Sequence, residues 1–188
     1  SYVEFITGEG GVIDTWLRRG AAGFRLDVAD ELPDDFIEKI RAAVKRVSPE
    51  KFLLGEVWED ATTKYGFGQR RTYLLGKGLD SVMNYPFKNA VLDFVKGKPA
   101  EQAMGEILSI CEHYPAPAMD TALNFLSTHD TERGLTVIAD EPANGRGRSA
   151  TPGRSVTGEA YEEAMLRLRV AVSWTSANFA QARPFRQR

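Results

Sequence analysis

The stretch AAGFRLDVADELPDDF, residues 21–36, decides the fold of this chain. Its segment 23–29 has the apolar content of a short buried strand, yet Arg25 and Asp27 lie in its middle. Because an unpaired charge is costly to bury, these two side chains need a partner or a function. They are two residues apart and so point to the same side of a strand, where the guanidinium would hold the carboxyl ionised.

The segments around this stretch alternate between helix and strand patterns. Residues 10–19 and 33–49 have apolar side chains at helical spacing, one segment before the charged strand and one after it. A second apolar strand is expected at 51–58 and a third, weaker one at 79–87. This order predicts right-handed βαβ units and a parallel sheet, which is an α/β fold.

The rest of the chain continues the pattern. Two helices, a fourth strand and two more helices are expected at 86–97, 99–114, 122–130, 131–139 and 159–174. Between the last two helices, the Gly-, Arg-, Pro- and Ser-rich segment 140–158 predicts a loop.

Composition excludes several classes of protein. The net charge of −2, with both signs mixed along 188 residues, argues against nucleic-acid and membrane-surface partners. Cys111 is the one cysteine, so no internal disulfide forms, and two histidines argue against a structural zinc site. No apolar run of about 18 residues predicts a membrane span. With no signal peptide visible, we expect a cytoplasmic protein.

Three carboxylates follow three of the predicted strands: Asp27, Glu56 and Asp130. In parallel α/β sheets and barrels, this carboxyl-terminal edge is where active sites form. Two carboxylates at one rim suit the cleavage of glycosidic bonds, one as nucleophile and the other as proton donor. Apolar neighbours of Glu56 predict a raised pKa, which suits the proton donor.

Each of these residues also has a structural interpretation. Arg25 and Asp27 could form a structural ion pair, and Glu56 could start a helix or lie in a loop. Asp130 could cap the residues that follow it. Their joint occurrence at one predicted edge favours a functional site.

Three motifs carry a family resemblance. GFRLDVADE (23–31), LLGEVWED (53–60) and FLSTHDTER (125–133) resemble conserved regions of the α-amylase family of glycoside hydrolases. LDSVMNYPF (79–87) resembles a segment of its neopullulanase and cyclomaltodextrinase branch. The resemblance covers residues 1–175 and implies strands four to seven of a (β/α)₈ TIM barrel. It also implies retaining, double-displacement hydrolysis of α-glucosidic bonds in maltooligosaccharides, pullulan or cyclodextrins.

The resemblance assigns a role to each matching residue. Asp27 matches the nucleophile, Glu56 the general acid/base, and Asp130 the aspartate that binds the cleaved sugar and stabilises the transition state. Arg25 matches the arginine that holds the nucleophile. His129 matches a histidine that hydrogen-bonds the same sugar.

Three further residues keep two interpretations. Trp58 could stack on a glucose ring, although an aromatic residue after a strand is more often part of the core. Asp30 and Glu31 could line the leaving-group side of the site. We favour the alternative, that they are charges at the start of a helix.

The chain also departs from the family pattern. A complete barrel needs about 250 residues, and nothing here matches the family's first three strands or its first conserved region. We assign residues 1–175 to a partial barrel and 176–188 to an atypical tail, and our hypothesis is a frameshift or truncation near residue 173. In a partial barrel the outer strands lack their neighbours, and such unpaired sheet edges predict a homo-oligomer. The far side of the sugar site would also be absent, which predicts little activity in this piece alone. No cofactor or metal is expected, since the family's calcium sites often lie in the regions without a match.

Two alternative functions remain open. One is a non-catalytic amylase-like domain that binds carbohydrate or a partner, although all three acids are retained. The other is a transglycosylase or isomerase of the same family. A nucleotide-binding fold is disfavoured because no Gly-x-Gly-x-x-Gly or P-loop follows a predicted strand.

Overall fold

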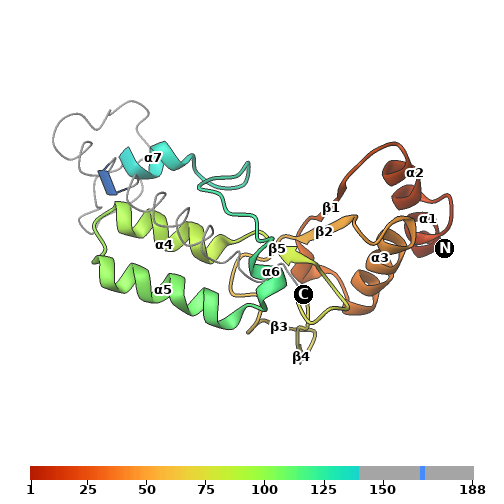
Figure 1. Ribbon diagram of the computed structural model, residues 1–188, viewed down its shortest axis with the longest axis horizontal. Coiled ribbons are helices and arrows are strands. Elements are labelled where there is room, and N and C mark those ends of the chain that lie inside the picture. Colours follow the sequence, from red (N-terminus) through yellow and green to blue (C-terminus); the bar gives the residue numbers. More distant parts are fainter. Residues whose placement is uncertain (140–165, 168–188) are drawn as a thin grey trace, which may run out of the picture. The chain divides into compact units, whose positions relative to one another are not determined.

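The computed structural model describes residues 1–139 and 166–167 (Figure 1). The chain divides into two compact units. The first unit comprises Ser1–Pro86 and Ser109–Asn124, and the second comprises Phe87–Leu108 and the chain from Phe125 onward.

A parallel sheet forms the centre of the first unit. Its strands are β1 (Gly23–Leu26), β2 (Phe52–Gly55) and β5 (Ser81–Val82), in the order β1-β2-β5. Leu26 pairs with Gly55 at the ends of β1 and β2, and Gly55 pairs with Val82. The predicted α/β architecture with a parallel sheet is confirmed.

Three helices of the first unit gather beside this sheet in Figure 1: α1 (Tyr2–Thr7), α2 (Val12–Arg18) and α3 (Asp34–Val47). The sequence explains α3 well, because Pro33 precedes it, acids open it, and Lys45 and Arg46 lie in its last turn. Its apolar stripe is buried, as the helical spacing predicted. The helical and sheet side chains of this core include Ile13, Leu17, Ile37, Ile40, Val44, Leu53 and Leu54.

Two carboxylates, one buried and one partly buried, tie the elements of the first unit together. Asp14 of α2 is 2% exposed and accepts hydrogen bonds from Arg46 Nη2 at 2.7 Å and the Gly10 amide at 3.2 Å. The Arg46 guanidinium and the Gly10 amide hold the pKa of Asp14 below its usual value. These contacts join α2 to α3.

Asp80, just before β5, makes the second connection. It accepts from Arg41 Nη1 at 2.7 Å, Lys45 Nζ at 2.8 Å and the Leu53 amide at 2.8 Å. Burial alone would raise the pKa of Asp80, but these donors outweigh it and lower the pKa. Asp80 therefore ties α3 to two strands of the sheet.

The connection from β2 to β5 contains a small hairpin. Strands β3 (Tyr65–Gly66) and β4 (Gln69–Arg70) pair antiparallel within the polar, Gly-containing segment 59–78. The pattern of alternating apolar residues was too short there to predict strands.

The remaining elements are helical. They are the 3₁₀-helix η1 (Ala29–Glu31), α4 (Tyr85–Val95), α5 (Ala100–His113), α6 (Ala116–Met119) and α7 (Gly134–Ala139). In the second unit Leu92, Val95 and Ile138 form a small core, with Val137 packed against it. No described helix is long and apolar enough to cross a bilayer.

The predicted fourth strand, at 122–130, was wrong in extent. Leu123 makes a single parallel bridge to Met83, through the Leu123 amide to Val82 O at 3.2 Å and the Asn84 amide to Leu123 O at 2.9 Å. The physical reason is that β5 is two residues long and α4 begins at Tyr85, so little backbone is available for pairing.

One helix was missed, and three predicted segments lie wholly or largely outside the described residues. Helix α1 was not predicted, because six residues are too few to show a clear apolar period. The predicted loop 140–158, most of the helix 159–174 and the tail 176–188 lie outside the described residues.

Candidate active site

Asp27 and Glu56 follow β1 and β2 directly, so they lie at the same edge of the sheet. The backbone pairing continues past both strands, with the Glu56 amide donating to Leu26 O at 2.9 Å. The Ala29 amide donates back to Glu56 O at 3.0 Å. The expectation that these two carboxylates lie on neighbouring strand ends is confirmed.

One guanidinium connects the two carboxylates. Arg25 Nη1 lies 2.5 Å from Asp27 Oδ1, and Arg25 Nη2 lies 2.9 Å from Glu56 Oε1. The second contact is a close ion pair without hydrogen-bond alignment, since Nη2 is buried and has no aligned acceptor. Arg25 Nε also lies 3.5 Å from Met83 Sδ. Sequence reasoning paired Arg25 with Asp27 and missed its contact with Glu56.

Glu56 is buried among hydrogen-bond donors. Its carboxylate accepts from the Val28 amide at 2.8 Å, Trp58 Nε1 at 3.0 Å and the Tyr85 hydroxyl at 3.1 Å. Burial raises the pKa of Glu56, but these donors and the Arg25 charge outweigh burial, so the net pKa is lowered. The predicted raised pKa was wrong, because the apolar neighbours in sequence are not the groups that face the carboxyl.

Val28 provides its amide through an unusual backbone conformation. Its φ of 42° and ψ of 55° lie in the left-handed region, which costs a β-branched residue about 1–2 kcal/mol. The chain needs this turn to pass from β1 into η1, and the turn aims the Val28 amide at Glu56. No signal in the sequence predicts it, since valine is among the residues least suited to positive φ.

Tyr85 was also missed by sequence reasoning, although it lies in the segment 79–87 that carries part of the family resemblance. Its ring stacks on Trp58, with centroids 4.9 Å apart and planes 15° apart. Trp58 is 48% exposed, so its side chain is only partly packed against the protein. The stacked pair supports Glu56 from one side and leaves part of the indole accessible.

The two carboxylates differ in accessibility. The Asp27 side chain is 71% exposed, whereas that of Glu56 is 2% exposed. Asp27 is therefore open to a substrate, and Glu56 is held within the protein by its donors.

His129 and Asp130 belong to the second unit, where they form a pair of their own. His129 Nε2 lies 3.0 Å from Asp130 Oδ2, and their side chains are 72% and 41% exposed. The Asp130 amide donates to Thr128 Oγ1 at 3.3 Å in a turn. The structure thus brings together Asp27, Glu56, Arg25 and Trp58, and the meeting of His129 and Asp130 with them stays a prediction.

Asp30 has a structural role in the first unit. It lies in η1, and its carboxylate accepts from the Tyr73 hydroxyl at 2.7 Å and pairs with Lys64 Nζ at 2.9 Å. Neighbouring Glu31 also lies in η1. Asp30 therefore fastens the connection after β2 to the segment after β1.

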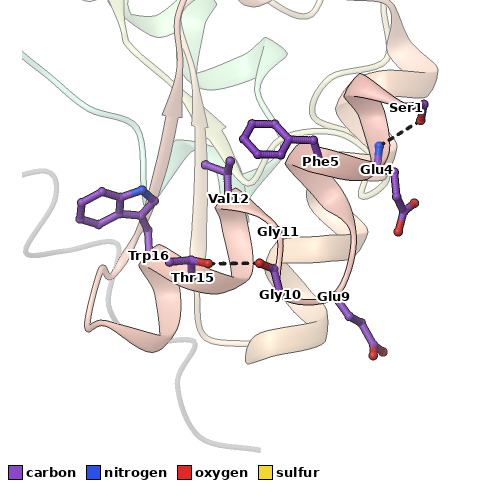
Figure 2. A pocket seen from close by; sticks show the side chains of 9 residues that line it. All are labelled: Ser1, Glu4, Phe5, Glu9, Gly10, Gly11, Val12, Thr15 and Trp16. Carbon is purple, nitrogen blue, oxygen red and sulfur yellow. Dashed lines mark hydrogen bonds between the residues drawn. The ribbon is translucent and has the colours of Figure 1, made fainter.

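A separate pocket of about 470 Å³ lies on α1, α2 and the turn between them (Figure 2). Its lining residues are Ser1, Glu4, Phe5, Glu9, Gly10, Gly11, Val12, Thr15 and Trp16. It contains none of the strand-end carboxylates. Over residues 1–139 and 166–167, no group of three or more His, Cys, Asp and Glu side chains is arranged to hold a metal ion.

Known proteins are similar to this chain in sequence and in fold. A family model described as alpha amylase, catalytic domain, matches residues 6–151. An amylopullulanase of Thermoanaerobacter thermohydrosulfuricus is 36% identical over 167 residues, covering 77% of this chain and 11% of that protein. A cyclomaltodextrinase of a Bacillus species is 39% identical over 127 residues, covering 64% of this chain and 21% of that protein.

Solved structures agree with the sequence matches. The ligand-free cyclic alpha-maltosyl-(1→6)-maltose hydrolase of Arthrobacter globiformis has a TM-score of 0.61 at 30% identity. That match covers 68% of this chain and 28% of the solved chain. This chain therefore spans well under a third of the length of each of these three relatives. It belongs to the alpha-amylase family, and its fold is part of that family's (β/α)₈ catalytic barrel.

Proposed function

We propose that this chain supplies the nucleophile and the general acid/base of a retaining α-glycosidase that acts on α-glucans. The observation that carries the proposal is the pair Asp27 and Glu56, on adjacent parallel strand ends and in contact with the guanidinium of Arg25. The names of the relatives, which are hydrolases of pullulan-type and cyclic glucans, support α-glucans as the substrate class.

In the proposed first step, Asp27 attacks the anomeric carbon of the bound sugar. The bond from that carbon to the leaving oxygen breaks, and Glu56 gives its proton to that oxygen. In the second step, Glu56 takes a proton from water, and the hydroxide replaces Asp27 at the sugar. The exposed Asp27 side chain suits the nucleophile, because it is open to substrate and is positioned by its contact with the Arg25 guanidinium.

Glu56 must bind a proton before the first step, and its surroundings make this the demanding part of the cycle. In the structure the donors and Arg25 favour its ionised form. A bound sugar excludes water and competes for these donors, and both effects raise the pKa of Glu56. We propose that substrate binding, rather than the empty site, prepares Glu56 as an acid.

We further propose that His129 and Asp130 bind hydroxyls of the same sugar. Both side chains are substantially exposed and polar, as a sugar-binding pair requires. The half-exposed indole of Trp58 would stack on a glucose ring next to Glu56.

The test is the release of reducing sugar from maltooligosaccharides, pullulan and cyclodextrins by the full-length protein. We expect Asp27→Asn and Glu56→Gln each to lower kcat by about a thousandfold or more, since each removes a reacting group. Asp35→Asn is the matched control, because Asp35 is 72% exposed on α3 and pairs with Lys39 alone among the described residues. Full activity in Asp27→Asn would refute the proposal.

We propose that the 188-residue chain by itself has little activity and associates with further copies. Within the described part of the chain, β1 pairs on one side with β2 and lies at an edge of the sheet. An unpaired edge strand is a template for pairing with another chain. Light scattering of the isolated chain should give a mass above that of one copy, and a monomer mass in dilute solution would contradict this.

A further inference from the structure

The tip of the β3–β4 hairpin presents two aromatic side chains to solvent. Tyr65 is 70% exposed and Phe67 is 66% exposed. They are two positions apart in the chain, with Tyr65 in β3 and Phe67 in the turn that joins β3 to β4. Exposed aromatic residues gathered at one place often mark a binding surface.

The backbone at this tip is strained at the residue that carries one of the aromatic rings, Phe67. Phe67 has φ of 51° and Gly68 has φ of 77°, so both central residues of the two-residue turn lie in the left-handed region. Such turns favour asparagine, aspartate or glycine at the first position, because a large side chain is strained there. A phenylalanine at this position therefore needs a reason other than the stability of the turn.

A buried arginine holds the hairpin in place. Arg71 is 2% exposed, and its guanidinium donates to Asp34 Oδ1 at 2.8 Å, Asp30 O at 2.9 Å and Leu32 O at 2.6 Å. The same guanidinium lies 5.4 Å from the centre of the Phe67 ring. The Phe67 ring thus has a fixed cation within the range of a cation–π contact, although the guanidinium lies nearer to the Tyr73 ring, at 4.5 Å.

Glycine makes this packing feasible. A Cβ at Gly66 would lie 3.0 Å from Arg71 Nη1, closer than such contacts normally allow. The hairpin backbone and the buried guanidinium are therefore closely fitted, and the aromatic tip is preorganised rather than loose.

The anchoring places the hairpin on the functional side of the sheet. Its partners Asp30, Leu32 and Asp34 follow β1 and Asp27 in the chain, at the carboxyl-terminal edge. Gln69 Nε2 adds a contact to Asp34 Oδ2 at 3.5 Å. The rings therefore belong to the same edge of the first unit as Asp27 and Glu56.

We propose that Tyr65 and Phe67 form a stacking platform for a glucose unit of an α-glucan, beyond the ring that is cleaved. A sugar ring has apolar C–H faces and polar edges, so it can cover an aromatic face while its hydroxyls stay in water. The identity of the ligand rests on the proposed function. The platform itself rests on the exposure, the strain and the anchoring of the two rings.

The test compares a long and a short substrate in the full-length protein. Because the proposed platform lies beyond the ring that is cleaved, we expect maltoheptaose to reach it and maltotriose to fall short of it. In the double variant Tyr65→Ala, Phe67→Asn we expect kcat/KM for maltoheptaose to fall about tenfold, which a loss of stacking can supply. For maltotriose we expect a change below about twofold.

Asparagine is chosen at position 67 because it suits a left-handed turn, so the variant should fold at least as well as the wild type. The matched control is Tyr2→Ala, since Tyr2 is 72% exposed on α1, and it should change neither substrate. Equal losses for the two substrates, or no loss for maltoheptaose, would overturn the platform.

The outcomes also separate this inference from the proposed function. If the wild type cleaves glucans and the double variant keeps its full rate on maltoheptaose, the platform fails while the proposed function stands. If the wild type releases no sugar, the proposed function fails, and calorimetric titration with maltoheptaose decides the platform. A dissociation constant unchanged in the double variant, or no heat of binding to the wild type, then overturns it.

Discussion

Replacing Arg25 with glutamine tests whether its guanidinium stabilises the buried carboxylate of Glu56. Arg25 Nη2 lies 2.9 Å from Glu56 Oε1, and the Glu56 side chain is 2% exposed. For charge centres about 4 Å apart at an effective dielectric constant of about 20, the attraction is about 4 kcal/mol. Three hydrogen bonds to Glu56 from uncharged donors survive the substitution. The Arg25 side chain is also 29% exposed, which weakens the pair.

We therefore expect Arg25→Gln to lower the free energy of unfolding by about 2–3 kcal/mol at neutral pH, less than a fully buried pair costs. The folded-state pKa of Glu56 lies below its ordinary value. Its stabilisation is thus present above the unfolded pKa and is lost as the pH falls through the folded pKa. Because the substitution raises the pKa of Glu56, the difference between the two proteins should shrink in acid.

The assay is urea unfolding followed by circular dichroism, near neutral pH and at about pH 3, below the range in which free glutamate titrates. A double-mutant cycle with Glu56→Gln should give a coupling of about 2 kcal/mol at neutral pH. The corresponding cycle with Asp27→Asn should give less than about 1 kcal/mol, since Asp27 is 71% exposed. A stabilising contact between Arg25 and Glu56 is refuted if Arg25→Gln costs as much when Glu56 is already glutamine, or costs the same at both pH values.

Three further substitutions test other parts of the structure. Val28→Gly should stabilise the protein by about 1 kcal/mol, because relief of strain exceeds the added freedom of glycine, and a higher urea midpoint would show it. Asp80→Asn should cost about 2–3 kcal/mol near neutral pH, since Asp80 binds two cations of α3 and the Leu53 amide. Its lowered pKa means that this cost should decline in acid, measured by urea unfolding over a pH series. Tyr73→Phe should cost about 1–2 kcal/mol by removing the bond to Asp30, and an unchanged thermal midpoint would contradict the 2.7 Å contact.

The parts of the fold that were predictable are those in which burial alone decides the structure. A few consecutive residues are enough to predict burial in these elements, from the apolar runs of β1 and β2 and from the apolar stripe along α3. The candidate pair Asp27 and Glu56 followed from these strands, because parallel strands bring their carboxyl ends to one edge.

The parts that were missed depend on contacts between distant residues. The donors that lower the pKa of Glu56 include Val28 and Tyr85, which lie 28 and 29 positions away in the chain. The neighbours of Glu56 in sequence show only that the site is apolar. Likewise, the fourth strand was overestimated because its length is set by its partner β5, and not by its own apolar residues.

The way that Glu56 is held has a consequence for motion. Its amide, its carbonyl and its carboxylate are all bonded to the segment Leu26–Ala29, so Glu56 cannot reorient unless that segment opens as well. The amide protons of Val28, Ala29 and Glu56 should then exchange with solvent at a common rate, set by one local opening. Asp27, exposed and held by one ion pair, can change its rotamer without such an opening. The two acids thus divide into a stationary group and an adjustable one, and any adaptation to a sugar at this edge falls to Asp27.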